Sequence, residues 1–321
     1  MKKIVTIGGG GGHSQVLKGL KRIPGVEITG ICPSTDSGGS TGILKKEYDG
    51  TGYVGDLTKC VVALCDDPIL SKALAFRYEN GPLDSHSVKN LLFHALEKVS
   101  SHGRALEEIW KICGIGPHKV LPVTNKKTEL CARLGAGRTI SGETNIDMLA
   151  KNPLWMPEVH SIKDIYLKPS VSATPEAVKA VKKADYIVVC PGDLYSSIVP
   201  VLLPKGMKKA IAASDAKIVL MLNIMTKKGE TDRYTATDFV KAIEKRLGRG
   251  ADYIVCNDAP IPRHILARYA LENKVMLGTL KKTHYSKIIM APLATISPSK
   301  EVLSDPAVIG KVVESIISRE R

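Results

Sequence analysis

The sequence predicts an α/β protein built on a mostly parallel, doubly wound sheet. Three observations carry this prediction. Short apolar runs typical of buried strands alternate with amphipathic helical patterns along most of the chain. A run of glycines joins the first strand to the first helix, and clusters of Gly, Asp, Asn, Ser and Thr follow five of the strands. Such sheets bind ligands beyond the carboxyl ends of their strands.

The first part of the chain gives a regular succession of elements. Leu57, Cys60, Val61 and Leu64 repeat at i, i+3, i+4 and i+7, which indicates one face of a helix. Pro24-Gly25 ends the first helix. The expected elements are strand 4–7, helix 15–23, strand 26–32, and helices 57–64, 91–99 and 105–110, with Ser87 placed to cap the helix before residue 91.

The pattern changes between residues 118 and 169. Short strands separated by Asn, Gly and Pro replace the alternation, and no long helical pattern lies between them. The expected strands are 120–123, 128–133, 138–141 and 162–167. We therefore expect a small antiparallel, β-rich subdomain over 118–169, inserted into a single domain that covers 1–321.

Alternation then resumes to the end of the chain. Thr174-Pro175 is a typical helix start, and Thr235 and Asp238 stand at the spacing of a capping box. The expected elements are strands 186–190, 218–222, 253–256 and 288–290 and helices 235–247 and 307–318.

The stretch from Gly8 to Ser14 predicts an anion site. A helix that starts directly after a strand leaves its first N–H groups unpaired, and its dipole favours phosphate there. Glycines permit a tight turn and close approach of a ligand. A flexible linker is the alternative, but linkers join domains rather than a strand and a helix. No third glycine completes a dinucleotide fingerprint and no Lys-Ser or Lys-Thr follows, so the ligand stays unnamed and NAD is disfavoured.

The polar clusters indicate where a site would form. They cover residues 8–14, 33–42, 191–197, 223–232 and 257–263, each directly after a predicted strand. In a parallel sheet all five lie at one rim, as functional loops on a rigid scaffold do. We expect the long polar segment 223–234 to close over the ligand.

Two acidic residues suit either ligand binding or turn formation. Asp36 follows the second strand, where it can bind a ribose, hold Mg²⁺ or form an Asx-turn. Asp56 can cap the helix that begins near it. If both carboxylates converge, they can hold Mg²⁺ together with phosphate oxygens.

Other side chains leave more than one interpretation open. His13 can cap its helix, contact phosphate or be a buried structural histidine. Asn90 and Asp193 stand at helix starts, where surface or capping roles compete with ligand contact. Tyr195 can pack half-buried. No Ser-His-Asp order and no catalytic cysteine signature stands out.

Composition excludes several classes of protein. The 321 residues carry a net charge of +14, but the lysines are scattered doublets and only three Phe and two Trp occur, which disfavours specific nucleic-acid binding. No apolar run is long enough to span a membrane, and the N-terminus is not a signal peptide. Seven cysteines without a C-x-x-C pair suit a reducing cytoplasm and argue against disulfides and a zinc site.

Six motifs together resemble a known family. In order they are GGGGGHSQVLKGL, DSGGSTG, GDL, HSVKNLL, PGDLYSSIVP and NIMTKKGETDRYTATD, from about Lys3 to Tyr269. They resemble the YvcK (gluconeogenesis factor) branch of the CofD-like superfamily. The resemblance implies a Rossmann-like three-layer α/β/α fold. It implies binding of UDP-sugars such as UDP-N-acetylglucosamine or UDP-glucose, and a cytoplasmic role in carbon metabolism, cell-wall synthesis and cell shape.

The sister branch suggests an alternative function. Its members are magnesium-dependent 2-phospho-L-lactate transferases of deazaflavin coenzyme biosynthesis, and their aspartates correspond to Asp36 and Asp56. The resemblance does not decide whether turnover occurs or whether the chain forms a homo-oligomer. Residues and resemblance together predict these ligand-binding positions: Gly9, Gly10, Gly11, Gly12, His13, Asp36, Ser37, Gly38, Gly39, Ser40, Thr41, Gly55, Asp56, Asn90, Gly192, Asp193, Leu194, Tyr195, Asn223, Thr226, Gly229, Glu230, Thr231 and Tyr269.

Overall fold

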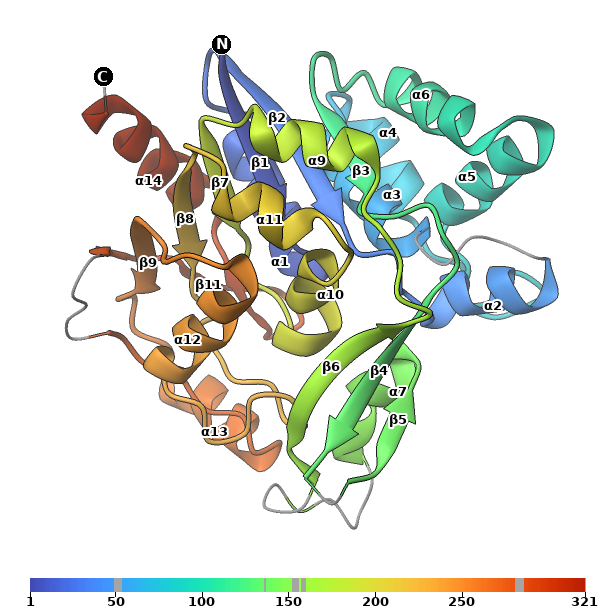
Figure 1. Cartoon of the computed structure of the whole chain (residues 1–321). Coiled ribbons are helices and arrows are strands. Elements are labelled where there is room, and N and C mark those ends of the chain that lie inside the picture. The colour runs from blue at the N-terminus through green and yellow to red at the C-terminus, as the bar shows by residue number, and fades with distance from the viewer. Residues whose placement is uncertain (49–53, 136, 152–155, 157–159, 281–285, 321) are drawn as a thin grey trace.

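A seven-stranded parallel sheet forms the centre of the molecule (Figure 1). The computed structural model describes residues 1–48, 54–135, 137–151, 156, 160–280 and 286–320. Across the sheet the strand order is β10-β9-β8-β7-β1-β2-β3. The strands are β1 (Lys2–Ile7), β2 (Val26–Cys32), β3 (Lys119–Pro122), β7 (Tyr186–Val189), β8 (Lys217–Met221), β9 (Tyr253–Asn257) and β10 (Lys287–Ala291).

The strand order reverses beside β1. The chain runs from β1 outward to β2 and β3, then returns to the other side of β1 and continues through β7 to β10. Ile7 at the end of β1 pairs with Ile31 of β2 and with Val189 of β7. The loops after β1 and β7 therefore flank the point where the strand order reverses, and doubly wound sheets bind ligands at such a point.

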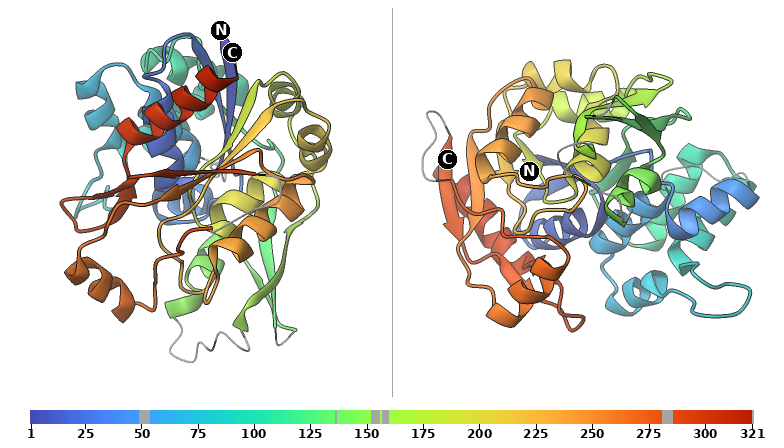
Figure 2. Two further views of the ribbon diagram at one scale, coloured as in Figure 1. Left: turned by 90° about the vertical axis from the view of Figure 1, so that its left-hand side faces the viewer. Right: turned by 90° about the horizontal axis from the view of Figure 1, so that it is seen from below.

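Helices cover both faces of the sheet, so the three-layer α/β/α prediction is confirmed (Figure 2). Leu17, Leu57 and Ile316 belong to the buried core on one face, and Ile187 and Phe239 to the core on the other. The first face carries α1 (Gly10–Leu20), α3 (Val54–Leu64), α5 (Val88–Val99), α6 (His102–Ile112), α13 (Arg263–Leu271) and α14 (Pro306–Arg319). The second carries α9 (Pro175–Lys182), α10 (Val199–Leu202), α11 (Met207–Ala212) and α12 (Ala236–Leu247).

A small antiparallel sheet projects from the chain between β3 and β7 (Figure 1). Its strands, in spatial order, are β5 (Thr139–Ser141), β4 (Glu129–Leu134) and β6 (Ile162–Lys168). Helix α7 (Glu143–Asp147) and the 3₁₀ turn Leu149–Lys151 lie between β5 and β6 in the chain. The expectation that residues 120–123 belong to this insertion is wrong, because Thr29 to Cys32 of β2 pair in parallel with Lys119 to Pro122. Parallel pairing puts β3 at the edge of the central sheet.

Several elements differ from the expected pattern. Helix α1 begins at Gly10 instead of residue 15, with Gly9 as its N-cap, so three glycines of the run belong to the helix. Residues 33–42 are not all loop, since α2 covers Gly39–Glu47. The apolar periodicity does not reveal α4 (Pro68–Ala75), the π-helical turn Leu194–Ile198 or the hairpin of β11 (Ala294–Ile296) and β12 (Val302–Ser304).

Two of the predicted helix caps are present, and the third, at Ser87, is not. Thr174 caps α9 by accepting from the Ala177 N–H, and Thr235 and Asp238 form the expected capping box. Ser87 occupies the N-cap position of α5, but its hydroxyl makes no capping bond and accepts instead from Lys89 Nζ at 2.8 Å.

Candidate functional site

The glycine turn after β1 lies at the switch point of the sheet. Gly10 has φ +65°, which a side chain disfavours, and starts α1. A Cβ at Gly12 would lie 2.1 Å from the carbonyl oxygen of Pro191 in the loop after β7. The turn therefore needs glycine for two separate reasons, a left-handed conformation and close packing of two backbone segments.

Asp56 occupies the amino end of the glycine helix. The Gly10 N–H donates to Asp56 Oδ1 at 2.8 Å, and a Cβ at Gly9 would lie 2.5 Å from Asp56 Oδ2. The prediction that Asp56 caps its own helix is wrong, because α3 already begins at Val54. Burial and the charge of Asp36 raise the pKa of Asp56 to about 6.

His13 is a buried structural residue. Its Nδ1 donates to the Gly8 carbonyl at 2.8 Å, and Thr6 Oγ1 lies 2.7 Å from Nε2. The ring also lies beside the thiols of Cys60 and Cys32. Because both ring nitrogens have protein partners and the side chain is fully buried, the expectation that His13 contacts phosphate is wrong for its side chain.

A polar cavity of about 350 Å³ opens on one side of the glycine turn. We call it the aspartate cavity, after Asp36 and Asp56. Asp36 Oδ2 accepts from Thr41 Oγ1 at 2.9 Å, and its Oδ1 accepts from the Gly38 N–H at 3.0 Å, which is the Asx-turn interaction. The lining residues are Gly10, Asp36, Gly38, Gly39, Ser40, Thr41, Gly55, Asp56, Lys59, Arg77, Lys89, Asn90, Glu143, Asp147, Asp193, Ser196, Ser197 and Lys227.

Gly55 lets the two acidic loops approach each other. A Cβ at that position would lie 2.1 Å from Asp36 Oδ2. The two carboxylates therefore face the same space, as the sequence predicts for a magnesium site. Two nearby carboxylates disfavour simultaneous ionisation, and a hard cation with phosphate oxygens relieves this repulsion, so the donor set fits Mg²⁺.

Cationic side chains that no motif of the sequence indicates line the same cavity. Lys59, Arg77 and Lys89 come from α3, the segment after α4 and α5. Burial and the charges of Lys59 and Arg77 lower the pKa of Lys89 to about 8. Their spacing along the chain gives no signal, because only the packing of α3 against α5 brings them together.

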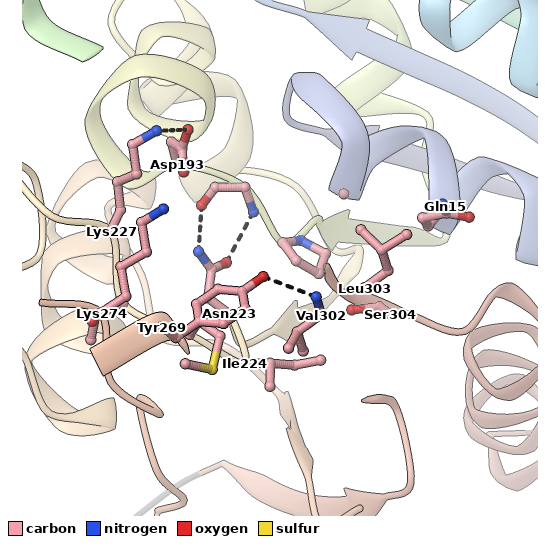
Figure 3. A pocket seen from close by; sticks show the side chains of 15 residues that line it. Gln15, Asp193, Asn223, Ile224, Lys227, Tyr269, Lys274, Val302, Leu303 and Ser304 are labelled. Carbon is pink, nitrogen blue, oxygen red and sulfur yellow. Dashed lines mark hydrogen bonds and ion pairs between the residues drawn. The ribbon is translucent and has the colours of Figure 1, made fainter. Parts of the chain in front are cut away.

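A second cavity of about 260 Å³ lies on the other side of the turn (Figure 3). We call it the tyrosine cavity, after Tyr269. The Tyr269 hydroxyl accepts from the Val302 N–H at 2.9 Å, and Lys274 Nζ lies 5.8 Å from the ring centroid. The lining residues are Gly12, Gln15, Pro191, Gly192, Asp193, Asn223, Ile224, Met225, Thr226, Lys227, Tyr269, Lys274, Val302, Leu303 and Ser304.

Asn223 and Lys227 hold the loops between the two cavities. The Asn223 side-chain amide accepts from the Gly192 N–H at 2.9 Å and donates to the Gly192 carbonyl at 2.7 Å. Lys227 Nζ lies 2.7 Å from Asp147 and 3.2 Å from Asp193. Asp193 and Lys227 line both cavities, so the cavities meet at this ion pair. The side chain of Asp193 forms this pair instead of a capping bond.

The polar loop 223–234 is held by a contact within itself and by bonds to Tyr195, Ser196 and Val275. Glu230 is buried and accepts from the Tyr195 N–H, the Ser196 N–H and Ser196 Oγ. Burial and the charge of Asp193 raise its pKa to about 8. Thr231 Oγ1 accepts from the Lys227 N–H at 2.8 Å, and Thr226 Oγ1 accepts from the Val275 N–H at 2.9 Å.

The predicted positions divide between the cavities and the core. Leu194, a predicted ligand-binding position, is fully buried in the apolar core. Tyr195 packs half-buried, as one of its two interpretations expects, and its hydroxyl bonds to that of Tyr234. Asn90 is buried and accepts from Thr58 Oγ1, which excludes a surface role. Gly229 and Glu230 line a third, smaller cavity. Predicted positions that line none of these three cavities are Gly9, Gly11, His13, Ser37, Leu194, Tyr195 and Thr231.

Fold and site together define a Rossmann-like α/β protein with a charged cavity at the switch point of its sheet. The CofD family, described as 2-phospho-L-lactate transferase CofD, matches residues 4–290. The gluconeogenesis factors of Halalkalibacterium halodurans and Bacillus subtilis are 38% and 35% identical, each over 84% of this chain and over 82% and 83% of their own. The chain belongs to the CofD family, in its gluconeogenesis factor branch.

The structural comparison agrees with this assignment. A solved structure of a UPF0052 family protein from Bacillus halodurans has a TM-score of 0.88 and 32% sequence identity, and the match covers 98% of this chain and 99% of that one. A Thermotoga maritima relative is 34% identical over 98% of this chain and 99% of its own. Within the described residues, no helix is both long enough and apolar enough to cross a bilayer.

Proposed function

We propose that this protein binds a UDP-sugar, UDP-N-acetylglucosamine or UDP-glucose, as a regulatory protein of carbon metabolism, cell-wall synthesis and cell shape. One observation carries the proposal: the two cavities meet at the glycine turn and share Asp193 and Lys227. A nucleotide sugar has a planar base, a sugar and a diphosphate between them, so it needs two adjoining spaces that differ in chemistry.

The chemistry of each cavity supports a particular part of the ligand. Lys59, Arg77 and Lys89 give the aspartate cavity the cations that a diphosphate needs. The first turn of α1 adds N–H donors at the positive end of the helix dipole between the two cavities, since Gly10 lines one cavity and Gly12 the other. Tyr269 and the apolar side chains of Met225 and Val302 give the tyrosine cavity an aromatic and apolar wall that suits a base or sugar.

Native mass spectrometry tests this proposal most directly. The protein purified from its own cytoplasmic extract should carry an added mass equal to a UDP-sugar. Isothermal titration calorimetry with UDP-N-acetylglucosamine, UDP-glucose, GDP and NAD should then show binding of a UDP-sugar in preference to the other two ligands. No added mass and no heat with either UDP-sugar would contradict the proposal.

A cellular experiment addresses the regulatory role. We expect a strain that lacks the protein to grow poorly on gluconeogenic carbon sources and to lose its normal cell shape, and the wild-type chain to restore both. Restoration by a variant that no longer binds UDP-sugar would separate the regulatory role from ligand binding.

The paired carboxylates support a second candidate, a magnesium-dependent phospholactyl transferase. Asp36 and Asp56 would hold the cation together with phosphate oxygens of an activated phospholactate. Bound Mg²⁺ would neutralise negative charge on the transferred phosphoryl group. Incubation of the protein with Mg²⁺, a deazaflavin acceptor and activated phospholactate tests this candidate, and absence of a phospholactylated product removes it.

A further inference from the structure

Three soft metal ligands meet beneath the glycine turn. The ligand atoms of His13, Cys32 and Cys60 all lie within 4.8 Å of one another, and all three residues are buried. Cys60 Sγ lies 3.4 Å and Cys32 Sγ lies 3.9 Å from His13 Nδ1. These residues come from α1, the end of β2 and α3, so the spacing of the cysteines, which argues against a zinc site, does not reveal the cluster.

The distances match those between the ligands of a tetrahedral zinc ion. With Zn–S near 2.3 Å and Zn–N near 2.05 Å, the sulfur and nitrogen ligands lie about 3.5 Å apart. The two S–N distances, 3.4 and 3.9 Å, fall on either side of this value. Nδ1 also bonds to the Gly8 carbonyl at 2.8 Å, so metal binding replaces this hydrogen bond.

We propose that His13, Cys32 and Cys60 form a binding site for a thiophilic divalent cation, with Zn²⁺ as the expected metal. Two thiolates and a neutral imidazole balance the charge of the cation, which a fully buried site requires. On binding, the cysteine thiols lose their protons to solvent. Because the site is closed to solvent, the metal enters as the chain folds.

The hydrogen bond between Thr6 and His13 is compatible with metal binding by His13. Without metal, the Gly8 carbonyl can only accept, so Nδ1 carries the proton and the Thr6 hydroxyl donates to Nε2. When Nδ1 binds the metal, the imidazole proton moves to Nε2 and donates to Thr6 Oγ1, because a hydroxyl also accepts. Metal-ligating histidines typically make this kind of hydrogen bond through their other nitrogen.

The site would fix the scaffold of the glycine turn. His13 belongs to the first turns of α1, Cys32 precedes the loop that carries Asp36, and Cys60 follows Asp56 by one helical turn. A metal ion bound to all three would tie together the segments that line the aspartate cavity. This inference concerns the interior of the scaffold and does not depend on which nucleotide the protein binds.

Metal content and cobalt spectroscopy test the site. The full chain is refolded with one equivalent of Zn²⁺ or Co²⁺, passed over a chelating resin and analysed by mass spectrometry for metal. We expect one bound metal per chain, and with Co²⁺ a sulfur-to-cobalt charge-transfer band with tetrahedral d–d bands. Absence of retained metal and of the charge-transfer band in the wild-type protein overturns the proposal, whatever the variants do.

Matched variants locate the metal. Cys60→Ser should lose the retained metal, whereas Cys256→Ser, which changes a buried cysteine of β9 outside the cluster, should keep it. Thr6→Val should weaken the affinity about 10–100-fold while retaining the charge-transfer band. Equal metal content in Cys60→Ser and wild type overturns the proposal, and so does a Cys32–Cys60 disulfide in the unreduced protein as purified.

Discussion

The backbone N–H of Gly10 donates to the carboxylate of Asp56 at 2.8 Å, across 46 positions of the chain. This bond places a negative charge at the helix end where the sequence predicts a free anion site. The donors left for a phosphate are therefore those of Gly11 and Gly12, supplemented by the cations around the aspartate cavity. A diphosphate bound there would face Asp56 and Asp36, which suggests that a divalent cation accompanies it.

The first prediction concerns Mg²⁺. Removing Mg²⁺ with a chelator should weaken UDP-sugar binding at least tenfold, because two carboxylates then face the diphosphate without a counter-ion. The Asp56→Asn variant should bind with an affinity that depends much less on Mg²⁺. Calorimetry with and without chelator measures both, and equal wild-type affinities under the two conditions would contradict the prediction.

The second prediction concerns Gly11. A Cβ at Gly11 meets no atom within 4 Å, so Gly11→Val should fold normally. The added side chain would stand on the first turn of α1, between Gly10 and Gly12, which line the two cavities, and UDP-sugar binding should be abolished. Gly103→Val is the matched control, since Gly103 is another helical glycine with open space around it, in α6. Unchanged affinity in a folded Gly11→Val protein would count against a phosphate at this turn.

The third prediction compares the stability of a Gly12 variant with that of a Gly11 variant. A side chain at Gly12 would lie 2.1 Å from the Pro191 carbonyl oxygen, so Gly12→Ala must push the loops after β1 and β7 apart. We expect a loss of about 1–3 kcal/mol in the free energy of unfolding, typical of overpacking. Gly11→Ala should change it by less than about 0.5 kcal/mol. Urea denaturation measures both values, and equal stability of the two variants would show that the loops do not touch.

The fourth prediction is a pH dependence set by Lys89. Its pKa near 8 means that the ammonium group is charged at pH 7 and neutral at pH 9. Affinity for the diphosphate should therefore fall as pH rises through 8. The other charged side chains that line this cavity include Lys59, Arg77, Asp36 and Asp56. Lys89→Met should lower the affinity at pH 7 about tenfold, the value of one charge-assisted hydrogen bond, and flatten the profile. A profile that is unchanged in Lys89→Met would assign the titration to another group.

The sequence predicted the local features well. Apolar periodicity located the central strands and the helices α3, α5 and α12, because each buries one face or stripe and the pattern is visible within a few residues. It also predicted the rim on which the polar clusters lie, since parallel strands all end at the same edge. It missed α2 and the hairpin of β11 and β12, which bury too little apolar surface to show a pattern.

The candidate site was predicted only in part. Asp36, Asp56 and the glycine turn were identified because turn residues and acids stand out in short motifs. Lys59, Arg77 and Lys89 were not, since a lysine on a helix has the same local signature whether it faces solvent or a cavity. For His13 the sequence left phosphate contact and burial both open, because the choice depends on Thr6, Gly8 and the packing of α3.

The sequence by itself determined the class of fold, the family and the position of a phosphate-type turn, all of which depend on residues close together in the chain. Only the tertiary structure decided which charges face one another across that turn. It set Asp56 against Gly10 and brought His13, Cys32 and Cys60 together beneath it. These relationships arise from helices packed on one face of the sheet, and distances between packed elements are not encoded in the spacing of residues along the chain.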